Sequence, residues 1–361
     1  MLRMTTALTL CAVPAIADVP LVVTDILPIH SLTAQVMQGV GVPEVLVTAG
    51  ASPHSFALRP SQARGLQEAN LVIWVGEGLT PWLEGPLETL APGARQLALL
   101  EAPETTQLAP RDLENFAPAG EGHSHDAHED HADHDDHAEH GEHDDHAEHD
   151  DHDDHADHAD HADHADHAEN DDHDDHADHD DHAGHDHGTV DPHAWLDPNN
   201  AVRWLDLIAA ELSVLDPENA ATYLSNADTA RAEIEAASAE IAELIVTAQD
   251  RPYIVFHDAY QYFEVAFDIP ARATLSINDA SPPGPAHIRE LQNIVAEEGI
   301  VCAFAEPQYD TRLLDTVFDG SEVTIALLDP IGVAAEPGPS HYLETLNQLA
   351  RNLADCLGDA S

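Results

Sequence analysis

The sequence predicts an α/β fold: two similar lobes, each built on a parallel β-sheet, joined by one long rigid helix, with a disordered His/Asp-rich insertion in the first lobe. Three observations predict it. Short apolar, β-branched runs alternate with segments of helical periodicity, which is typical of βαβ units. One helical pattern, over residues 217–248, is too long for an ordinary crossover helix. A stretch from Glu121 to Gly188 holds 22 His and 29 Asp or Glu and cannot form a core.

The elements follow in order along the chain. In the first lobe we expect strands at 20–24, 45–48, 71–75 and 96–100, and helices at 31–39, 61–69 and 81–90. A helix at 199–212 precedes the long helix, for which Asp216 is the expected N-cap and Pro217 the first helical residue. In the second lobe we expect strands at 253–256, 271–275, 301–305 and 323–328, and helices at 285–298, 311–317 and 341–357. The domain boundaries are therefore 18–216, 217–248 and 249–361.

Residues 1–17 have the pattern of a secretory signal peptide. Arg3 gives a short positive region, residues 5–16 are apolar, and Ala15-Ile16-Ala17 is an A-x-A cleavage site. We therefore expect cleavage after Ala17 and export to the periplasm. A lipoprotein anchored through Cys11 is the alternative, which Leu10 disfavours because a small residue is usual there.

Cleavage removes Cys11 and leaves Cys302 and Cys356. Two cysteines in an exported chain favour one disulfide, with two unpaired buried thiols as the alternative. The bond would close a loop of about 54 residues and stabilise the protein by roughly 4 kcal/mol.

The insertion carries about half of the net charge of the chain. There are 12 Arg, no Lys and 69 acidic residues, so the net charge is −57. This balance excludes binding to nucleic acid or to an anionic membrane and favours a cationic partner. Imidazoles interleaved with carboxylates predict many weak metal sites, with a solvated acidic linker as the alternative. The candidate ligands recur at every third residue: His125, His128, His131, His134, His137, His140, His143, His146, His149, His152, His155, His158, His161, His164 and His167.

Four potential ligands outside the insertion are expected near the ends of strands: His54, His193, His257 and Asp329. Open α/β sheets bind ligands at the carboxyl ends of their strands, so these side chains are expected to converge between the lobes. Three imidazoles and one carboxylate suit a tetrahedral Zn²⁺ site. Taken singly, each residue could equally be a cap or a surface group. His30 is kept as an alternate or supporting ligand, whereas His287 and His341 are expected at the surface.

Five segments carry a resemblance to a known family: Ser52-Pro53-His54 with Leu58-Arg59-Pro60-Ser61, Asp191-Pro192-His193-Ala194-Trp195, Phe256-His257-Asp258-Ala259-Tyr260, Phe304-Ala305-Glu306-Pro307-Gln308 and Leu328-Asp329-Pro330-Ile331-Gly332. With them the mature chain resembles the solute-binding proteins of ABC transporters that deliver zinc or manganese, and most of all the zinc-uptake (ZnuA-like) members. The resemblance implies a periplasmic protein with Zn²⁺ between its lobes and a membrane permease as partner. We expect it to act as a monomer.

The resemblance also implies which residues bind the metal. His54, His193 and His257 match the three His ligands, and His257 stands where manganese-type relatives carry a carboxylate. The cysteine pair matches a disulfide of the second lobe. Pro53 stands where some zinc members have Glu, which leaves Asp329 or water as the fourth ligand.

The expected function is capture of Zn²⁺ and its delivery to a permease. A zinc buffer or metallochaperone without a transport role is one alternative, and a binding protein for manganese or another divalent metal is a second. An enzyme is disfavoured, because the chain has no H-E-x-x-H, G-x-S-x-G or P-loop motif. Glu306 is the residue that could have served as a general base.

Overall fold

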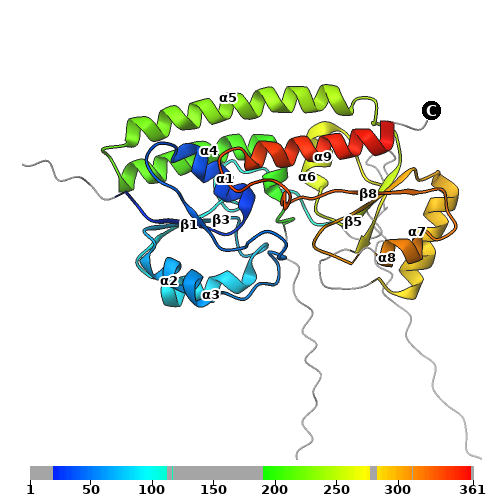
Figure 1. The fold of residues 1–361 in the computed structure, drawn as a ribbon, viewed down its shortest axis with the longest axis horizontal. Coiled ribbons are helices and arrows are strands. Elements are labelled where there is room, and N and C mark those ends of the chain that lie inside the picture. The colour runs from blue at the N-terminus through cyan, green and yellow to red at the C-terminus, as the bar shows by residue number, and fades with distance from the viewer. Residues whose placement is uncertain (1–18, 112–115, 117–189, 277–282, 311, 359–361) are drawn as a thin grey trace, which may run out of the picture. The chain divides into compact units, whose positions relative to one another are not determined.

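The computed structural model describes residues 19–111, 116, 190–276, 283–310 and 312–358 (Figure 1). All of them belong to one compact unit. The predicted signal peptide, its cleavage after Ala17 and the His/Asp-rich insertion lie outside the described residues, so these predictions stay untested.

The first lobe is built on a parallel sheet of four strands in the order β2-β1-β3-β4. The strands are β1 (Val22–Thr24), β2 (Glu44–Val45), β3 (Leu71–Trp74) and β4 (Arg95–Ala98). The two central strands, β1 and β3, are buried along their whole length, which is why they read as continuous apolar runs in the sequence.

The second lobe repeats this arrangement. Its sheet has the order β6-β5-β7-β8, again with parallel strands. The strands are β5 (Tyr253–His257), β6 (Ala273–Ser276), β7 (Cys302–Ala305) and β8 (Thr324–Leu327). Two similar α/β lobes are therefore confirmed, with equivalent strand orders.

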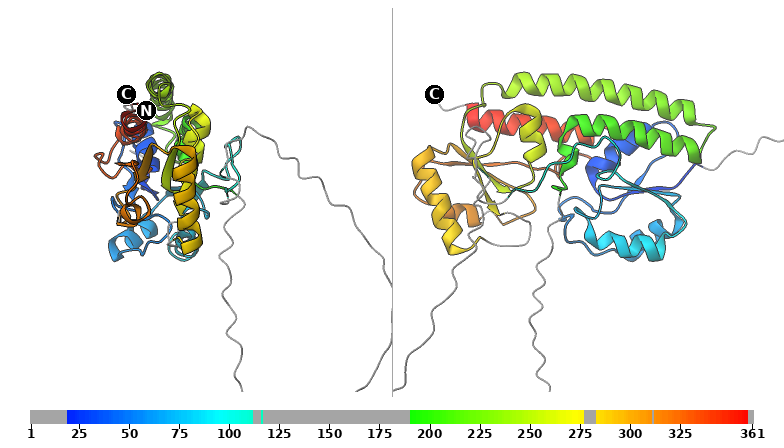
Figure 2. Two further views of the ribbon diagram at one scale, coloured as in Figure 1. Left: turned by 90° about the vertical axis from the view of Figure 1, so that its right-hand side faces the viewer. Right: turned by 180° about the vertical axis from the view of Figure 1, so that it is seen from behind.

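Helices cover both faces of each sheet (Figures 1 and 2). In the first lobe α2 (Pro60–Glu68) and α3 (Glu84–Leu90) pack on one face, and α1 (Leu27–Val36) and α4 (Pro198–Leu215) on the other. In the second lobe α7 (Pro285–Glu298) and α8 (Arg312–Val317) face α6 (Gln261–Phe267) and α9 (His341–Gly358) across the sheet. Two 3₁₀ helices complete the set, η1 (Pro81–Leu83) and η2 (Ala194–Leu196).

The long helix is α5, which spans the 26 residues Ala220–Ile245. Its buried residues recur every three or four positions and pack against α1, α4, α6 and α9, so α5 contacts elements of both lobes (Figure 1). The expected start was wrong. Asp216 is not the N-cap, because its carboxylate accepts hydrogen bonds from Asn219 Nδ2 (2.6 Å) and Tyr223 OH (2.8 Å), and the helix begins at Ala220.

Contacts other than those of α5 also connect the two lobes. The C-terminal helix α9 contacts α1 of the first lobe as well as α5 and β8, and the largest hydrophobic core contains residues of both lobes. The predicted disulfide is present between Cys302 of β7 and Cys356 of α9, with a Cα–Cα distance of 6.3 Å. Among the described residues, no helix is both long enough and apolar enough to cross a membrane.

The helix α6 was not anticipated from the sequence. It has only seven residues, and most of its side chains are buried, including Glu264. A short helix buried around most of its circumference leaves no amphipathic pattern to detect. Its position matters, because it directly follows the end of β5 and His257.

Candidate metal centre

Three imidazoles from different parts of the chain meet at one point. His54 lies in the loop after β2, His193 immediately precedes η2, and His257 is the last residue of β5. One ligand nitrogen of each lies within 4.8 Å of the others. Within the described part of the chain, these three side chains are the group that is spaced closely enough to bind one metal ion. They are three of the four predicted ligands.

The spacing of two of these nitrogens fits a tetrahedral metal ion. Bonds of about 2.0–2.1 Å from Zn²⁺ to imidazole place neighbouring ligand nitrogens roughly 3.3–3.4 Å apart in a tetrahedron. The Nε2 atoms of His54 and His193 are 3.3 Å apart. The centroid of the His257 ring lies 5.3 Å from that of His193 and 6.4 Å from that of His54.

Two of the imidazoles are oriented by buried carboxylates. Asp191 Oδ1 lies 2.8 Å from His193 Nδ1, and Glu306 Oε1 lies 2.6 Å from His257 Nδ1. A carboxylate at Nδ1 favours the tautomer that carries its proton there, so the Nε2 lone pair is left for a metal. Both acids are almost fully buried, which places negative charge behind the ligands and favours a cation in front of them.

His54 is positioned by packing in the first lobe. The indole nitrogen of Trp82 donates to the carbonyl of Pro53 at 2.7 Å, which fixes the residue before His54. The Trp82 ring also lies against Phe56, at 5.3 Å between ring centroids. His54 is half-buried whereas His193 and His257 are buried, so His54 is the most exposed of the three.

The space between the imidazoles is small. Their pocket is also lined by Trp195, Glu306, Tyr309 and Ile331 and encloses about 10 Å³. That is roughly the room of one water molecule. A space of this size between the three imidazoles suits a single ion.

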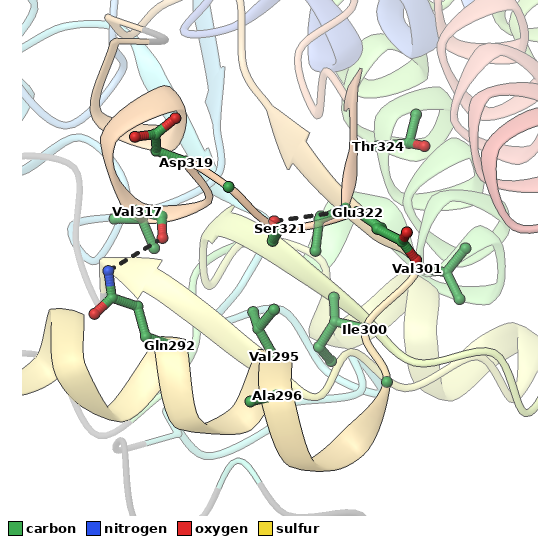
Figure 3. A pocket seen from close by; sticks show the side chains of 13 residues that line it. Gln292, Val295, Ala296, Ile300, Val301, Val317, Asp319, Ser321, Glu322 and Thr324 are labelled. Atoms are coloured by element: carbon green, nitrogen blue, oxygen red, sulfur yellow. Dashed lines mark hydrogen bonds between the residues drawn. The ribbon is translucent and has the colours of Figure 1, made fainter.

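A much larger hollow of about 820 Å³ lies elsewhere in the second lobe, between α7 and the segment from Val317 to Thr324 (Figure 3). It lies at the amino ends of β7 and β8, whereas the imidazoles lie at the carboxyl end of β5. It is lined by aliphatic side chains, such as Val295 and Ile300, and by about as many polar ones, such as Gln292 and Asp319 (Figure 3). Size alone would favour this hollow as the binding site. The chemistry of the side chains favours the three imidazoles, because they can bind a metal ion.

Asp329 is not brought into the cluster. Its Oδ1 accepts hydrogen bonds from Gln308 Nε2 and from the amides of Ile331 and Gly332, and its Oδ2 accepts one from the amide of Val333 at 2.6 Å. An Asp followed by a turn commonly bonds to its own backbone in this way. In this structure Asp329 organises the loop after β8, and its carboxylate is not among the ligand atoms that gather at the three imidazoles.

Gly332 is required by that loop. It has a φ of +76°, and a Cβ atom there would lie 2.0 Å from Thr345 Oγ1. The loop also supplies Pro330, whose carbonyl accepts a hydrogen bond from the indole of Trp195 at 2.9 Å. It thereby holds the residues after His193.

The three other histidines in the described part of the chain, His30, His287 and His341, lie apart from the cluster. His30, kept as an alternate or supporting ligand, lies inside α1, where its Nε2 is 3.1 Å from the carbonyl of Pro43. Burial lowers the pKa of His30 below its ordinary value. His341 was expected at the surface and is fully buried, with its Nε2 3.0 Å from the carbonyl of Gly332. His287 contacts the carbonyl of Thr274 at 2.9 Å.

Sequence reasoning missed the two carboxylates that orient the imidazoles. Glu306 is the first residue after β7, so the strand-end argument that nominated the histidines also applies to it. Asp191 stands two residues before His193, a spacing at which an Asp can bond both the backbone and the ring. Neither pairing could be read from the sequence, because each depends on the direction of the side chain.

Comparison with known proteins gives the family. The family model described as "Zinc-uptake complex component A periplasmic" (ZnuA) matches residues 22–356. The chain belongs to this family. The high-affinity zinc uptake system protein ZnuA of Paracoccus denitrificans is 45% identical over 353 residues, covering 98% of this chain and 96% of the relative. Its counterpart in Brucella abortus is 37% identical over 336 residues, covering 93% of this chain and 91% of the relative.

Comparison with solved structures shows the same fold. A zinc-bound ZnuA deletion mutant superposes with a TM-score of 0.65 at 18% identity, covering 94% of this chain and 98% of that one. The solute-binding protein FpvC of Pseudomonas aeruginosa with Mn²⁺ gives 0.67 at 16% identity, covering 95% and 100%. At these identities the likeness shows the two-lobed fold, which zinc-bound and manganese-bound proteins both have.

Proposed function

We propose that this chain captures Zn²⁺ in the periplasm, with His54, His193 and His257 as ligands, and delivers it to the permease of an ABC transporter. The observation that carries the proposal is the convergence of three imidazoles, two of them with Nδ1 held by a buried carboxylate. Membership in the ZnuA family supports zinc as the cargo.

Zinc is favoured over manganese by the ligand atoms. Imidazole nitrogen suits Zn²⁺, whereas Mn²⁺ prefers carboxylate and water oxygens. Within the described part of the chain, the cluster offers three nitrogens and no carboxylate oxygen. His257→Glu would add a harder ligand and should shift the preference toward manganese.

We propose water as the fourth ligand. The sequence left Asp329 and water as alternatives, and both oxygens of Asp329 are occupied by the amides of its own loop and by Gln308. Three histidines and a water also occur in catalytic zinc sites. Here Glu306, the candidate base, is bonded to His257 Nδ1. The proposed role is therefore binding without catalysis.

The location and the partners belong to the same proposal. Export by the predicted signal peptide, with cleavage after Ala17, would place the chain in the periplasm. It would act there as a monomer, with the permease as its protein partner and without binding nucleic acid. The net charge of −57 supports a cationic cargo and argues against nucleic acid.

A growth experiment tests the proposal. A strain that lacks the chain should grow poorly in medium with a zinc chelator, and the wild-type chain should restore growth. His193→Ala and His257→Ala should fail to restore it. His287→Ala is the matched control, since it removes an imidazole outside the cluster, and it should restore growth. Full restoration by His193→Ala and His257→Ala together would contradict the proposal.

A zinc buffer without a transport role is the second candidate, and the composition of the insertion favours it. Twenty-two imidazoles in one segment could hold many ions weakly. Loss of a buffer should raise sensitivity to excess zinc and leave growth under chelation unchanged, which is the opposite of the transport result.

A further inference from the structure

Arg111 joins two buried carboxylates next to the metal cluster. Its Nε lies 3.1 and 3.0 Å from the two carboxylate oxygens of Asp258, and Nη2 donates to the same group. Its Nη1 and Nη2 donate to Glu264 at 2.6 and 3.1 Å. Asp258 directly follows His257, and Glu264 lies in α6. The guanidinium therefore fixes the chain immediately after a proposed ligand.

The second proposed ligand is tied to the same place. The hydroxyl of Tyr262, in α6, accepts a hydrogen bond from the amide of Leu108 at 2.9 Å and donates to the carbonyl of Asp191 at 2.8 Å. The amide of Asp191 donates to the carbonyl of Leu108 at 2.8 Å. Asp191 in turn holds both the backbone and the ring of His193.

These contacts form one unit, which we call the α6 clasp: Arg111, Asp191, Asp258, Tyr262 and Glu264. Gln261 adds to it, because the favourable orientation of its amide donates to Ala109 O at 3.1 Å and to Asp191 Oδ2 at 2.9 Å. Segments on both sides of residues 112–189 thereby meet at α6. The clasp connects the carboxylate partner of His193 with the neighbour of His257, although the two ligands are far apart in sequence.

The buried ion pairs of the α6 clasp favour a fixed geometry. The side chains of Arg111, Asp258 and Glu264 are 13%, 7% and 2% exposed, so water screens their interactions little. A guanidinium binds two carboxylates in a fixed plane, which a lysine ammonium cannot do. The network stabilises a unique arrangement because both acids would be left buried and unpaired without it.

We propose that Arg111 is a positioning residue for the metal site: through the α6 clasp it sets the placement of His193 relative to His257 and so determines how tightly zinc is held. This inference rests on the proposed function. Trp195 also anchors the chain near His193, by its hydrogen bond to the carbonyl of Pro330. Trp195 follows His193 in the sequence whereas Asp191 precedes it, and this contact does not involve Asp258.

The test measures zinc binding and metal-free stability separately in the full chain. The Trp195 ring lies 5.3 Å from the ring of His193, and none of the four Trp lies in residues 121–188, so a zinc-dependent change in intrinsic fluorescence is expected from the site. Zinc is titrated against a competing chelator in wild type, Arg111→Lys and Tyr262→Phe. Arg95→Lys is the matched control, since Arg95 pairs with Glu211 at an exposed position of the first lobe.

Arg111→Lys should weaken zinc binding by about 10- to 100-fold, the range found for groups that orient metal ligands. Tyr262→Phe removes one hydroxyl, keeps the ion pairs and should weaken binding by a smaller factor. Arg95→Lys should bind as the wild type does. The metal-free variants should still unfold cooperatively, at temperatures above that of the titration. A purely structural role of Arg111 would also allow this result, but it would not produce a loss of zinc affinity in the folded protein.

Wild-type affinity in a folded Arg111→Lys protein would overturn the inference. If Arg111→Lys does not fold, Tyr262→Phe decides in its place, and wild-type affinity there would overturn the inference equally. If the wild-type protein itself showed no zinc-dependent change in Trp fluorescence, the result would count against the proposed function as a whole. It would then not concern the role of Arg111 alone.

Discussion

Replacing Glu306 by Gln should weaken zinc binding without destabilising the metal-free protein. Glu306 is 1% exposed, and its Oε1 lies 2.6 Å from His257 Nδ1. A glutamine can keep the hydrogen bond through its amide oxygen but lacks the charge. The carboxylate makes the imidazole a better ligand and stabilises a cation bound on its other side, and both effects are lost with the charge.

The magnitude follows from the hydrogen bond. Hydrogen bonds to charged groups contribute about 1.5–3 kcal/mol, and neutral ones roughly half as much. A loss of about 1.4 kcal/mol corresponds to a tenfold rise in Kd. The weakened hydrogen bond alone therefore corresponds to about a 3- to 13-fold rise in Kd. Because little water screens the buried charge, we expect its full loss to raise Kd by about 10- to 100-fold, the range found for groups that orient metal ligands. Metal-free Glu306→Gln should melt at the wild-type temperature or above it, because a buried charge is costly without its cation.

The assay is competitive zinc titration followed by Trp fluorescence, with thermal unfolding in the presence of a chelator. Glu298→Gln is the matched control: Glu298 is 47% exposed in its side chain and lies 3.9 Å from Arg272. It should change neither quantity. An unchanged Kd in Glu306→Gln would refute the reasoning, since the carboxylate would then contribute nothing to the metal site.

Three other predictions follow from particular contacts. Asp329→Asn should lower metal-free stability by about 1–3 kcal/mol, because it disturbs the amides that the carboxylate satisfies. Zinc affinity in a titration should stay within about threefold, and a larger loss would contradict a purely local role of Asp329 in its loop. Burial raises the pKa of Asp25 to about 7 from 3.8, so the folded state binds more protons than the unfolded state between these values and stability falls as the pH rises. The free energy of unfolding of metal-free Asp25→Asn, measured with denaturant relative to wild type, should therefore rise by up to about 4 kcal/mol from pH 4 to pH 7. Parallel pH profiles of the two proteins would contradict this. Cys302→Ser with Cys356→Ser should cost roughly 4 kcal/mol in the same assay, and a loss under 1 kcal/mol would mean that the cross-link constrains little.

The sequence predicted the sheets well because their central strands are apolar throughout. Residues 71–75 and 253–256 are buried on both faces, so they read as continuous apolar runs bounded by polar residues. The long helix was equally clear from its length, although its start at Ala220 depends on how the carboxylate of Asp216 is used. The short helix α6 left no periodic signal.

The site was predictable as far as strand ends determine it. His54 lies in the loop after β2 and His257 ends β5, and the structure brings them together with His193. The same argument nominated Asp329, which could also bond the amides that follow it; the sequence does not say which option is realised. The contacts of Arg111 with Asp258 and Glu264 join residues about 150 positions apart, so no local pattern indicates them.

The central claim is that His54, His193 and His257 bind the zinc ion. X-ray diffraction at the zinc absorption edge, from crystals of the mature chain loaded with one equivalent of zinc, tests it most directly. We expect the strongest anomalous peak between the three imidazoles, about 2.0–2.1 Å from each ligand nitrogen. A strongest peak anywhere else, or one that lacks any of these three imidazoles as a ligand, would contradict the account.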